Sequence, residues 1–157
     1  MKESKRDKKA ICICQDFDDI KLNKKKLKSL IGDICKRNGV KKYSVNVAIV
    51  DDAAIIKINK KFLRHNKTTD VISFDLTGEE EKADKNFELI INAQQAIREA
   101  DARGHSPQSE VALYITHGLL HQLGFDDLDA AEAKKMHAEE DRILQENDFP
   151  SVYYSKD

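Results

Sequence analysis

Long apolar segments are missing from this sequence. A helix that crosses a membrane needs an apolar run of about 18 or more residues, and no such run is present. The segment Met1–Ala10 is rich in charge and lacks the apolar core of a secretory signal. We therefore expect a protein without membrane association that is located in the cytoplasm.

Cysteine is also scarce. Cys12, Cys14 and Cys35 are odd in number and too few for a disulfide scaffold. The first two are spaced like half of a metal site, but no second cysteine pair is present to complete four ligands. The alternative, which we favour, is that both side chains point to one face of a strand and pack there as small hydrophobic groups.

The composition is that of one soluble globular domain, with 40% hydrophobic and 35% charged residues in a chain of 157. We expect a single domain over residues 1–157, with residues 1–9 as a disordered arm. The net charge of −1 conceals an uneven distribution. Lys21–Lys42 is strongly basic with Asp33 as its one acid, whereas acids dominate Asp126–Asp148. This asymmetry hints at a polyanionic partner, although lysine-rich helix faces are more often simply solvated.

Apolar periodicity predicts strands and helices that are interspersed without strict alternation. The expected strands are Ile11–Phe17, Tyr43–Val50, Val71–Leu76 and Phe87–Asn92, and the last two are expected to pair antiparallel. The expected helices begin at the capping residues Asn23, Asp51, Ser106 and Asp129, with a further one from Ala93 to Ala102. We predict an α+β domain in which a mixed sheet of about four strands packs against helices. The helix that begins at Ser106-Pro107 is apolar on nearly all sides and should be central and buried.

Two histidines lie on one face of that central helix. His117 and His121 are four residues apart, about one turn, so their imidazoles can converge on a single ion. Gly124 is placed to end the helix in a left-handed conformation. The chain then turns back and brings Asp126 or Asp127 toward the same ion. Two nitrogens and one carboxylate oxygen form a set of three ligands with an open fourth position, which is typical of catalytic zinc.

The spacing also matches that of zinc peptidases of the H-E-x-x-H-x-x-G-x-x-H type, with Asp127 at the third ligand position. Those enzymes use the glutamate after the first histidine as a base, and Gly118 occupies that position here. Peptide hydrolysis is therefore disfavoured. Phosphodiester hydrolysis remains open, because a metal ion lowers the pKa of water and neutralises charge on a phosphate.

Two sequence blocks resemble one known family. The block His117-Gly-x-Leu-His121-x-x-Gly124-Phe-Asp126-Asp127 is similar to the H-G-x-L-H-L-x-G-Y-D-H signature of the YbeY family, bacterial endoribonucleases of ribosomal RNA maturation. A second block, Asn59-x-x-Phe62-Leu63-x-x-Asn66-x-x-Thr69-Asp70-Val71-Ile72-Ser73-Phe74, resembles that family's N-x-x-[YFW]-[RL]-x-x-D-x-x-T-D-V-L-S-F. The resemblance implies a zinc-dependent endoribonuclease that prefers single strands, acts on the small ribosomal subunit and serves in ribosome quality control.

The resemblance also implies the site residues. His117, His121 and Asp127 are the expected metal ligands, with one Zn²⁺ per chain. Asp126 matches the family's own aspartate, so Asp127 stands where the family has a third histidine; an oxygen donor there also suits manganese or magnesium. Some family members carry an arginine at the position of Leu63, and the adjacent Arg64 is our candidate catalytic residue. No small-molecule cofactor is expected.

Other polar residues near these blocks have two interpretations each. Asp70 either bonds the amides of a turn or lies, with Ser73, beside the scissile phosphate. Glu110 is either a partner that orients His117 or a solvated glutamate near the start of the helix. His65, His105 and His137 are at spacings that exclude them from the metal group. Three hypotheses follow: a metal-dependent endoribonuclease, a metallopeptidase, and a non-catalytic ribosome-assembly factor with a structural metal and a functional basic face.

Overall fold

A computed structural model describes residues 9–63, 69–80 and 83–150. Its sheet contains β1 (Lys9–Gln15), β2 (Tyr43–Val50), β3 (Val71–Asp75) and β4 (Lys85–Asn92), in the order β1-β2-β4-β3. β1, β2 and β4 are parallel, and β3 pairs antiparallel with β4. The predictions of an α+β fold, of a four-stranded mixed sheet and of the antiparallel β3–β4 pair are confirmed.

The helices of the described residues are α1 (Lys24–Arg37), α2 (Asp52–Ile58), α3 (Ala93–Arg103), α4 (Pro107–Gln122) and α5 (Ala130–Glu146), and a π-helical turn, η2 (Asn59–Leu63), follows α2. Capping side chains begin the helices where the sequence predicts them. The side chain of Asn23 accepts a hydrogen bond from the amide of Lys26, and the side chain of Asp129 accepts one from the amide of Glu132. These bonds satisfy amides that have no partner inside the helix.

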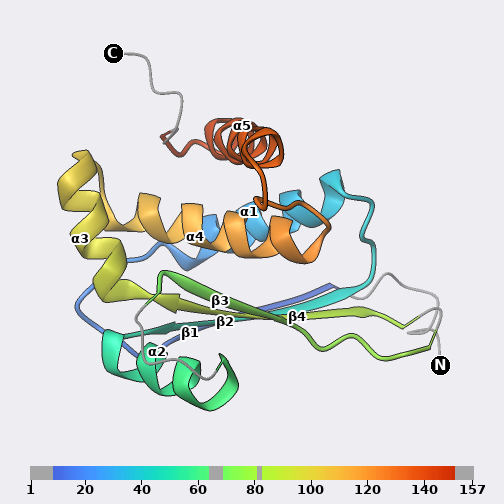
Figure 1. The fold of residues 1–157 in the computed structure, drawn as a ribbon, viewed down its shortest axis with the longest axis horizontal. Helices are drawn as coiled ribbons and strands as arrows, with labels where there is room; N and C mark the ends of the chain where they lie inside the picture. The colour runs from blue at the N-terminus through green and yellow to red at the C-terminus, as the bar shows by residue number, and fades with distance from the viewer. Residues whose placement is uncertain (1–8, 64–68, 81–82, 151–157) are drawn as a thin grey trace.

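The layers place α4 at the centre of the molecule (Figure 1). α1 and α4 cover one face of the sheet, with α1 contacting β1 and α4 contacting β3 and β4, while α2 lies against the other face. α5 packs on α4 on the side away from the sheet. Because α4 has neighbours on several sides, most of its residues from Ser109 to Leu120 are buried. The prediction of a central buried helix is confirmed.

The N-terminal segment differs from our expectation at one residue. Lys9 is the first residue of β1 and pairs with Tyr43 of β2, so it does not belong to a disordered arm. Residues 1–8 lie outside the described part of the chain. Among the described residues, no helix combines the length and the apolar character that crossing a membrane requires.

Cys12 and Cys14 are both in β1, where side chains two residues apart share one face of the sheet. Both are exposed, whereas Ile13 between them is buried. The prediction that they pack as small hydrophobic groups is therefore wrong. β1 is an edge strand, and in the described structure its neighbours do not cover the face that carries the thiols. Cys35 on α1 is buried, and burial raises its pKa to about 11.

Candidate metal centre

The two histidines lie near the C-terminal end of α4, as their spacing predicts. Their rings are stacked, with centroids 6.2 Å apart and planes inclined by 13°. The side chain of His117 is 28% exposed, and His121 is exposed. The helix therefore presents two parallel imidazoles at the surface of an otherwise buried element.

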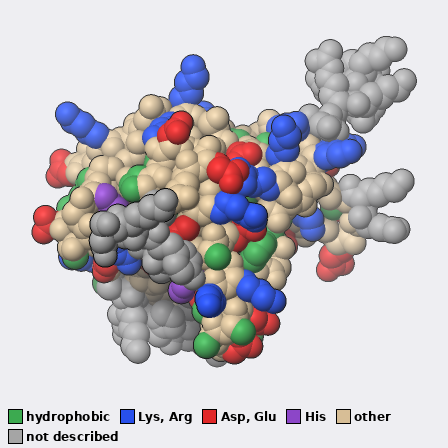
Figure 2. Space-filling model, turned by 90° about the horizontal axis from the view of Figure 1, so that it is seen from above, with side chains coloured by type: hydrophobic (Ala, Val, Ile, Leu, Met, Phe, Trp, Pro, Cys, Tyr) green, Lys and Arg blue, Asp and Glu red, His purple; other side chains and the backbone are tan. Residues whose placement is uncertain are grey.

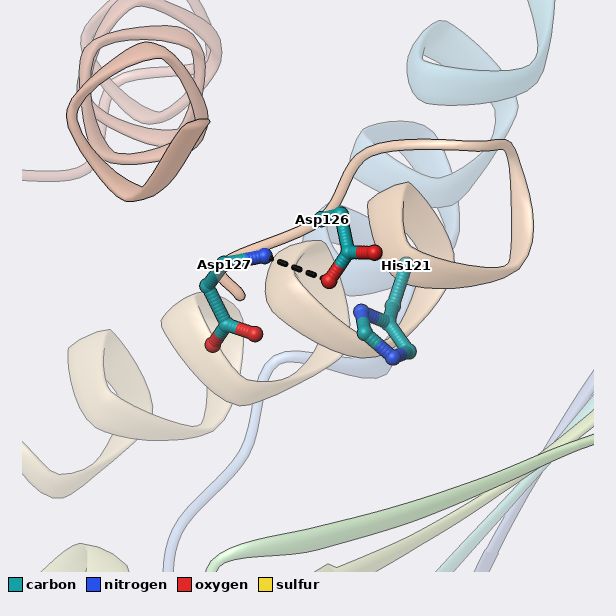
Figure 3. Close-up of side chains that lie close together, drawn as sticks. All are labelled: His121, Asp126 and Asp127. Atoms are coloured by element: carbon teal, nitrogen blue, oxygen red, sulfur yellow. Dashed lines mark hydrogen bonds between the residues drawn. The ribbon is translucent and has the colours of Figure 1, made fainter. Parts of the chain in front are cut away.

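The chain reverses direction immediately after α4. Gly124 has a φ of +105°, a value that side chains disfavour, and the amide of Phe125 donates to the carbonyl of Leu120 at 3.0 Å. This is the pattern of a glycine-terminated helix end, and it confirms the role predicted for Gly124. The reversal carries Asp126 and Asp127 back beside the end of the helix (Figure 3).

Three residues bring potential ligand atoms together at this end. His121, Asp126 and Asp127 each offer one atom, and these atoms lie within 4.8 Å of one another. Asp126 Oδ1 also accepts from the amide of Asp127 at 2.7 Å, which holds the turn in shape (Figure 3). His117 adjoins the group, since its Nε2 lies 3.9 Å from Asp127 Oδ2.

This donor set fits a divalent cation. The edge of a zinc tetrahedron is about 3.4 Å for metal–ligand bonds of about 2.1 Å, so the observed separations need only small side-chain movements. Two imidazoles and two carboxylates are donors that zinc and related metals accept. Within the described residues, no lysine or arginine forms an ion pair with Asp126 or Asp127. In the described part of the chain, His117 is the basic side chain within ion-pair distance of these carboxylates, with its Nε2 3.9 Å from Asp127 Oδ2.

The arrangement brings two of the predicted ligands, His121 and Asp127, together with Asp126, and His117 lies beside this group with its Nε2 3.9 Å from Asp127 Oδ2. The sequence interpretation considered both aspartates and chose Asp127, because Asp126 matches the aspartate of the family's own motif. The turn instead places both carboxylates next to His121, since Asp126 and Asp127 follow the glycine reversal directly. Asp126 is thus a candidate ligand that reasoning from sequence left aside.

A glutamate on α5 contacts the first histidine. Glu140 Oε2 lies 2.8 Å from His117 Nδ1, and Glu140 is fully buried. Burial alone would lower the pKa of His117, but the hydrogen bond and the charge of Glu140, together with the charges of Asp70 and Asp127, raise its pKa above the ordinary value. Sequence reasoning missed Glu140. The only signal was an acid in a helix expected to pack nearby.

Gly118 has a packing role that its position in the motif does not reveal. A Cβ at this position would lie 3.0 Å from Leu89 Cδ2 and 3.2 Å from Val71 Cγ2. The glycine therefore allows α4 to approach β3 and β4 closely. A glutamate at this position would point into the sheet, where it could not serve as the base of a peptidase.

The residues of the second sequence block have separate outcomes. Arg64 and His65 lie outside the described residues, so the catalytic assignment of Arg64 stays a prediction. Asp70 Oδ1 accepts from the amide of Val71 at 2.7 Å, as the turn interpretation expects, while its charge also acts on His117. Ser73 Oγ accepts from Gln122 Nε2 at 2.8 Å and so joins β3 to the last turn of α4.

Glu110 is neither a partner of His117 nor a solvated residue, so both interpretations are wrong. It is fully buried and forms ion pairs with Arg103 and His105 at the other end of α4. Arg103 belongs to α3 and His105 to the loop that joins α3 to α4, and both side chains contact Glu110 in the first turn of α4. His105 therefore lies with Glu110 at the opposite end of α4 from His117 and His121.

Comparison with known proteins identifies the family. A family model described as Endoribonuclease YbeY matches residues 12–148. The chain belongs to this family. Endoribonuclease YbeY of Endomicrobium trichonymphae is 34% identical over 119 residues, which cover 76% of this chain and 82% of that protein. The Moorella thermoacetica protein of the same name is 39% identical over 109 residues, or 64% of this chain and 70% of its own length.

Two further relatives extend the comparison. The chloroplastic endoribonuclease YBEY of Arabidopsis thaliana is 33% identical over 80% of this chain, which spans only 22% of that longer protein. A solution structure of a Thermotoga maritima protein matches with a TM-score of 0.61 at 23% identity, covering 87% of this chain and 88% of that one, and supports the fold. The family predicted from the two sequence blocks is confirmed, and with it the class of enzyme, a hydrolase that cleaves phosphodiester bonds in RNA.

Proposed function

We propose that this protein is a metal-dependent endoribonuclease that cleaves single-stranded segments of small-subunit ribosomal RNA in the cytoplasm, during ribosome maturation and quality control. The observation that carries the proposal is the group of His117, His121, Asp126 and Asp127 at the end of α4. Family membership supports the RNA substrate and the processing of ribosomal RNA. The preference for single strands and the role in quality control rest on the resemblance of the two sequence blocks.

The donor set supports zinc as the ion, with manganese or magnesium as alternatives because half of the donors are carboxylates. His117 and His121 would bind it through ring nitrogens, and Asp126 and Asp127 through carboxylate oxygens. When bound, such an ion activates water at neutral pH and neutralises charge on the phosphate.

The side chains around the ion prepare the site for an anionic substrate. Without a cation, the carboxylates of Asp126 and Asp127 repel the RNA backbone. With one bound, the net negative charge of the group is cancelled and a phosphate can approach. Asp126 and Asp127 would therefore disfavour RNA at this point unless they hold a cation.

The basic residues of α1 are the other element of the proposal. Lys24, Lys25 and Lys28 are exposed on α1, which packs against α4. The start of α1 contacts Gln108 in the first turn of α4, at the opposite end of that helix from the metal centre. Basic and acidic side chains are interspersed over the described part of the face seen in Figure 2. These lysines would attract RNA by charge, at a distance from the metal centre.

A chelation experiment tests the proposal. Purified protein is incubated with single-stranded small-subunit ribosomal RNA and with a duplex of the same sequence, first as prepared, then with chelator, then with zinc restored. Cleavage of the single strand that stops with chelator and returns with zinc is expected. Intact RNA in every sample would contradict it and favour the assembly-factor hypothesis. Charge reversal at Lys24, Lys25 and Lys28 would then abolish ribosome association while Asp127→Ala would have no effect.

A further inference from the structure

We infer that Glu140 is a positioning residue that sets which ring nitrogen of His117 faces the metal centre. The inference rests on the proposed function only in taking that centre to hold a divalent cation. His117 Nδ1 is 2.8 Å from Glu140 Oε2, on a helix 23 residues further along the chain. The other ring nitrogen, Nε2, is 3.9 Å from Asp127 Oδ2. Glu140 and the acidic turn therefore contact opposite sides of one imidazole.

The burial of Glu140 makes this contact unusual. Glu140 is 0% exposed, and its second oxygen, Oε1, has no hydrogen-bond partner among the described residues. A buried carboxylate with unsatisfied hydrogen bonds is costly, so a residue at this site needs a compensating role. Among the described residues its ion pair is with His117, and Arg142 on the same helix pairs with Glu139 instead.

The contact determines the tautomer of the ring. A carboxylate can only accept, so His117 must carry a hydrogen on Nδ1 to bond with it. In the neutral ring the lone pair is then on Nε2, the nitrogen that faces Asp127. Histidine ligands of metal ions commonly donate their other N–H to a carboxylate, which fixes ring orientation and makes the ligand more basic.

The two histidines of the pair therefore have different roles. The ring of His117 is oriented by its hydrogen bond to Glu140 of α5, so its Nε2 already faces the metal centre. His121 is exposed, and its ring forms no hydrogen bond with the described residues. Occupancy of the site should thus depend on the packing of α5 against α4, although α5 carries none of the candidate ligands.

The test compares Glu140→Gln with Glu139→Gln, a neighbour whose carboxylate pairs with Arg142 at the surface. Zinc affinity of each metal-free protein is measured by competition with a chromophoric chelator. Because loss of such a supporting carboxylate lowers metal affinity by about 10- to 100-fold, we expect a loss of that size for Glu140→Gln and none for Glu139→Gln. Glu140→Asp, which keeps the charge, should recover part of the affinity.

A second readout does not depend on the stability of a variant, because it uses the wild-type protein. Nitrogen-detected NMR of the histidine rings in the zinc-loaded wild type should show His117 with its hydrogen on Nδ1. Unchanged zinc affinity in a folded Glu140→Gln, or a hydrogen on Nε2 of His117, would overturn the inference. If Glu140→Gln does not fold, the wild-type spectrum decides alone.

The outcomes separate this inference from the proposed function. A wild type that binds zinc but leaves RNA intact removes the proposed activity and leaves the role of Glu140 standing. A wild type that binds no divalent metal removes the proposed function, and the tautomer of His117 in the metal-free protein then decides whether Glu140 orients the ring.

Discussion

The two ends of α4 each place histidine beside carboxylate, with opposite results. At the N-terminal end, buried Glu110 has Arg103 Nη1 at 3.1 Å and also contacts His105. At the C-terminal end, Asp126 and Asp127 adjoin the histidine pair, and no arginine or lysine of the described residues pairs with either of them. Within the described residues, the first group therefore contains an arginine that balances Glu110, whereas the second group contains no arginine or lysine.

This difference shows which group is structural and which is prepared to bind. A buried carboxylate that is paired on both oxygens joins elements of the fold, here α3 and the following loop to α4. Partly exposed carboxylates without a cationic partner add little to stability, and their oxygens can bind a metal ion. Histidine–carboxylate proximity alone does not distinguish the two; the balance of charge does.

The largest expected effect comes from removing a ligand at the C-terminal end. His121→Ala should lower zinc affinity by at least about 100-fold, since loss of a direct ligand costs no less than loss of its supporting partner. Because His121 is exposed, the free energy of unfolding without metal should change little. The control is His105→Ala at the other end, which should leave zinc affinity unaltered. Equal losses of zinc affinity in the two variants would contradict the assignment of metal binding to the C-terminal end of α4.

Removing the acid at the N-terminal end should affect stability instead. Glu110→Ala leaves Arg103 and His105 without their acceptor, and we expect about 2 kcal/mol of destabilisation in urea unfolding of the metal-free protein. The side chain of Arg103 is 35% exposed and can regain water, which keeps the loss below that of a fully buried pair. Glu99→Ala removes the longer surface contact to Arg103 at 3.7 Å and a hydrogen bond from Gln95 Nε2 at 2.9 Å, and it should cost less than about 1 kcal/mol because the side chain is 37% exposed.

Substitution of the glycine beside His117 tests how closely the C-terminal half of α4 must approach the sheet. Gly118→Ala brings a methyl group to 3.0 Å from Leu89 Cδ2, and overpacking should outweigh the gain in helix propensity by about 1 kcal/mol. Gly32→Ala in α1 is the matched control, because its Cβ would meet Tyr43 Oη at an ordinary 3.7 Å. That variant should be slightly stabilised. If urea unfolding shows that both substitutions change the free energy of unfolding in the same direction, the packing argument is contradicted.

The smallest expected effect is on the stability of the metal-free protein when an acid at the C-terminal end is neutralised. Asp127→Asn should change the free energy of unfolding by less than about 0.5 kcal/mol in the presence of chelator, because the residue is exposed and unpaired with arginine or lysine. Saturating zinc should stabilise the wild type by mass action and the variant less. Asp126→Asn measured beside it shows which carboxylate binds more strongly. A large loss in chelator would mean that this end is structural as well.

Local patterns account for what could be predicted of the fold. The caps at Asn23, Ser106 and Asp129 act within three residues of their own position, so they depend on no distant contact. The histidine pair follows from the helical period, and the reversal at Gly124 follows from the rarity of positive φ in other residues. The strand order, with β4 inserted between β2 and β3, is a matter of tertiary pairing that local patterns do not specify.

The sequence by itself determined the family and the fold class, and it singled out His117, His121 and Asp127 as candidate ligands, because each depends on short spacings or on motifs. Only the tertiary structure decided how the charges are distributed around them. The charge of Glu110 is balanced by Arg103 of α3, which packs on α4. Glu140 contacts His117, 23 residues away in the sequence, because α5 packs on that helix. Such pairings depend on which helices meet. The packing of helices therefore makes one end of α4 a closed structural group and leaves the other open to a cation.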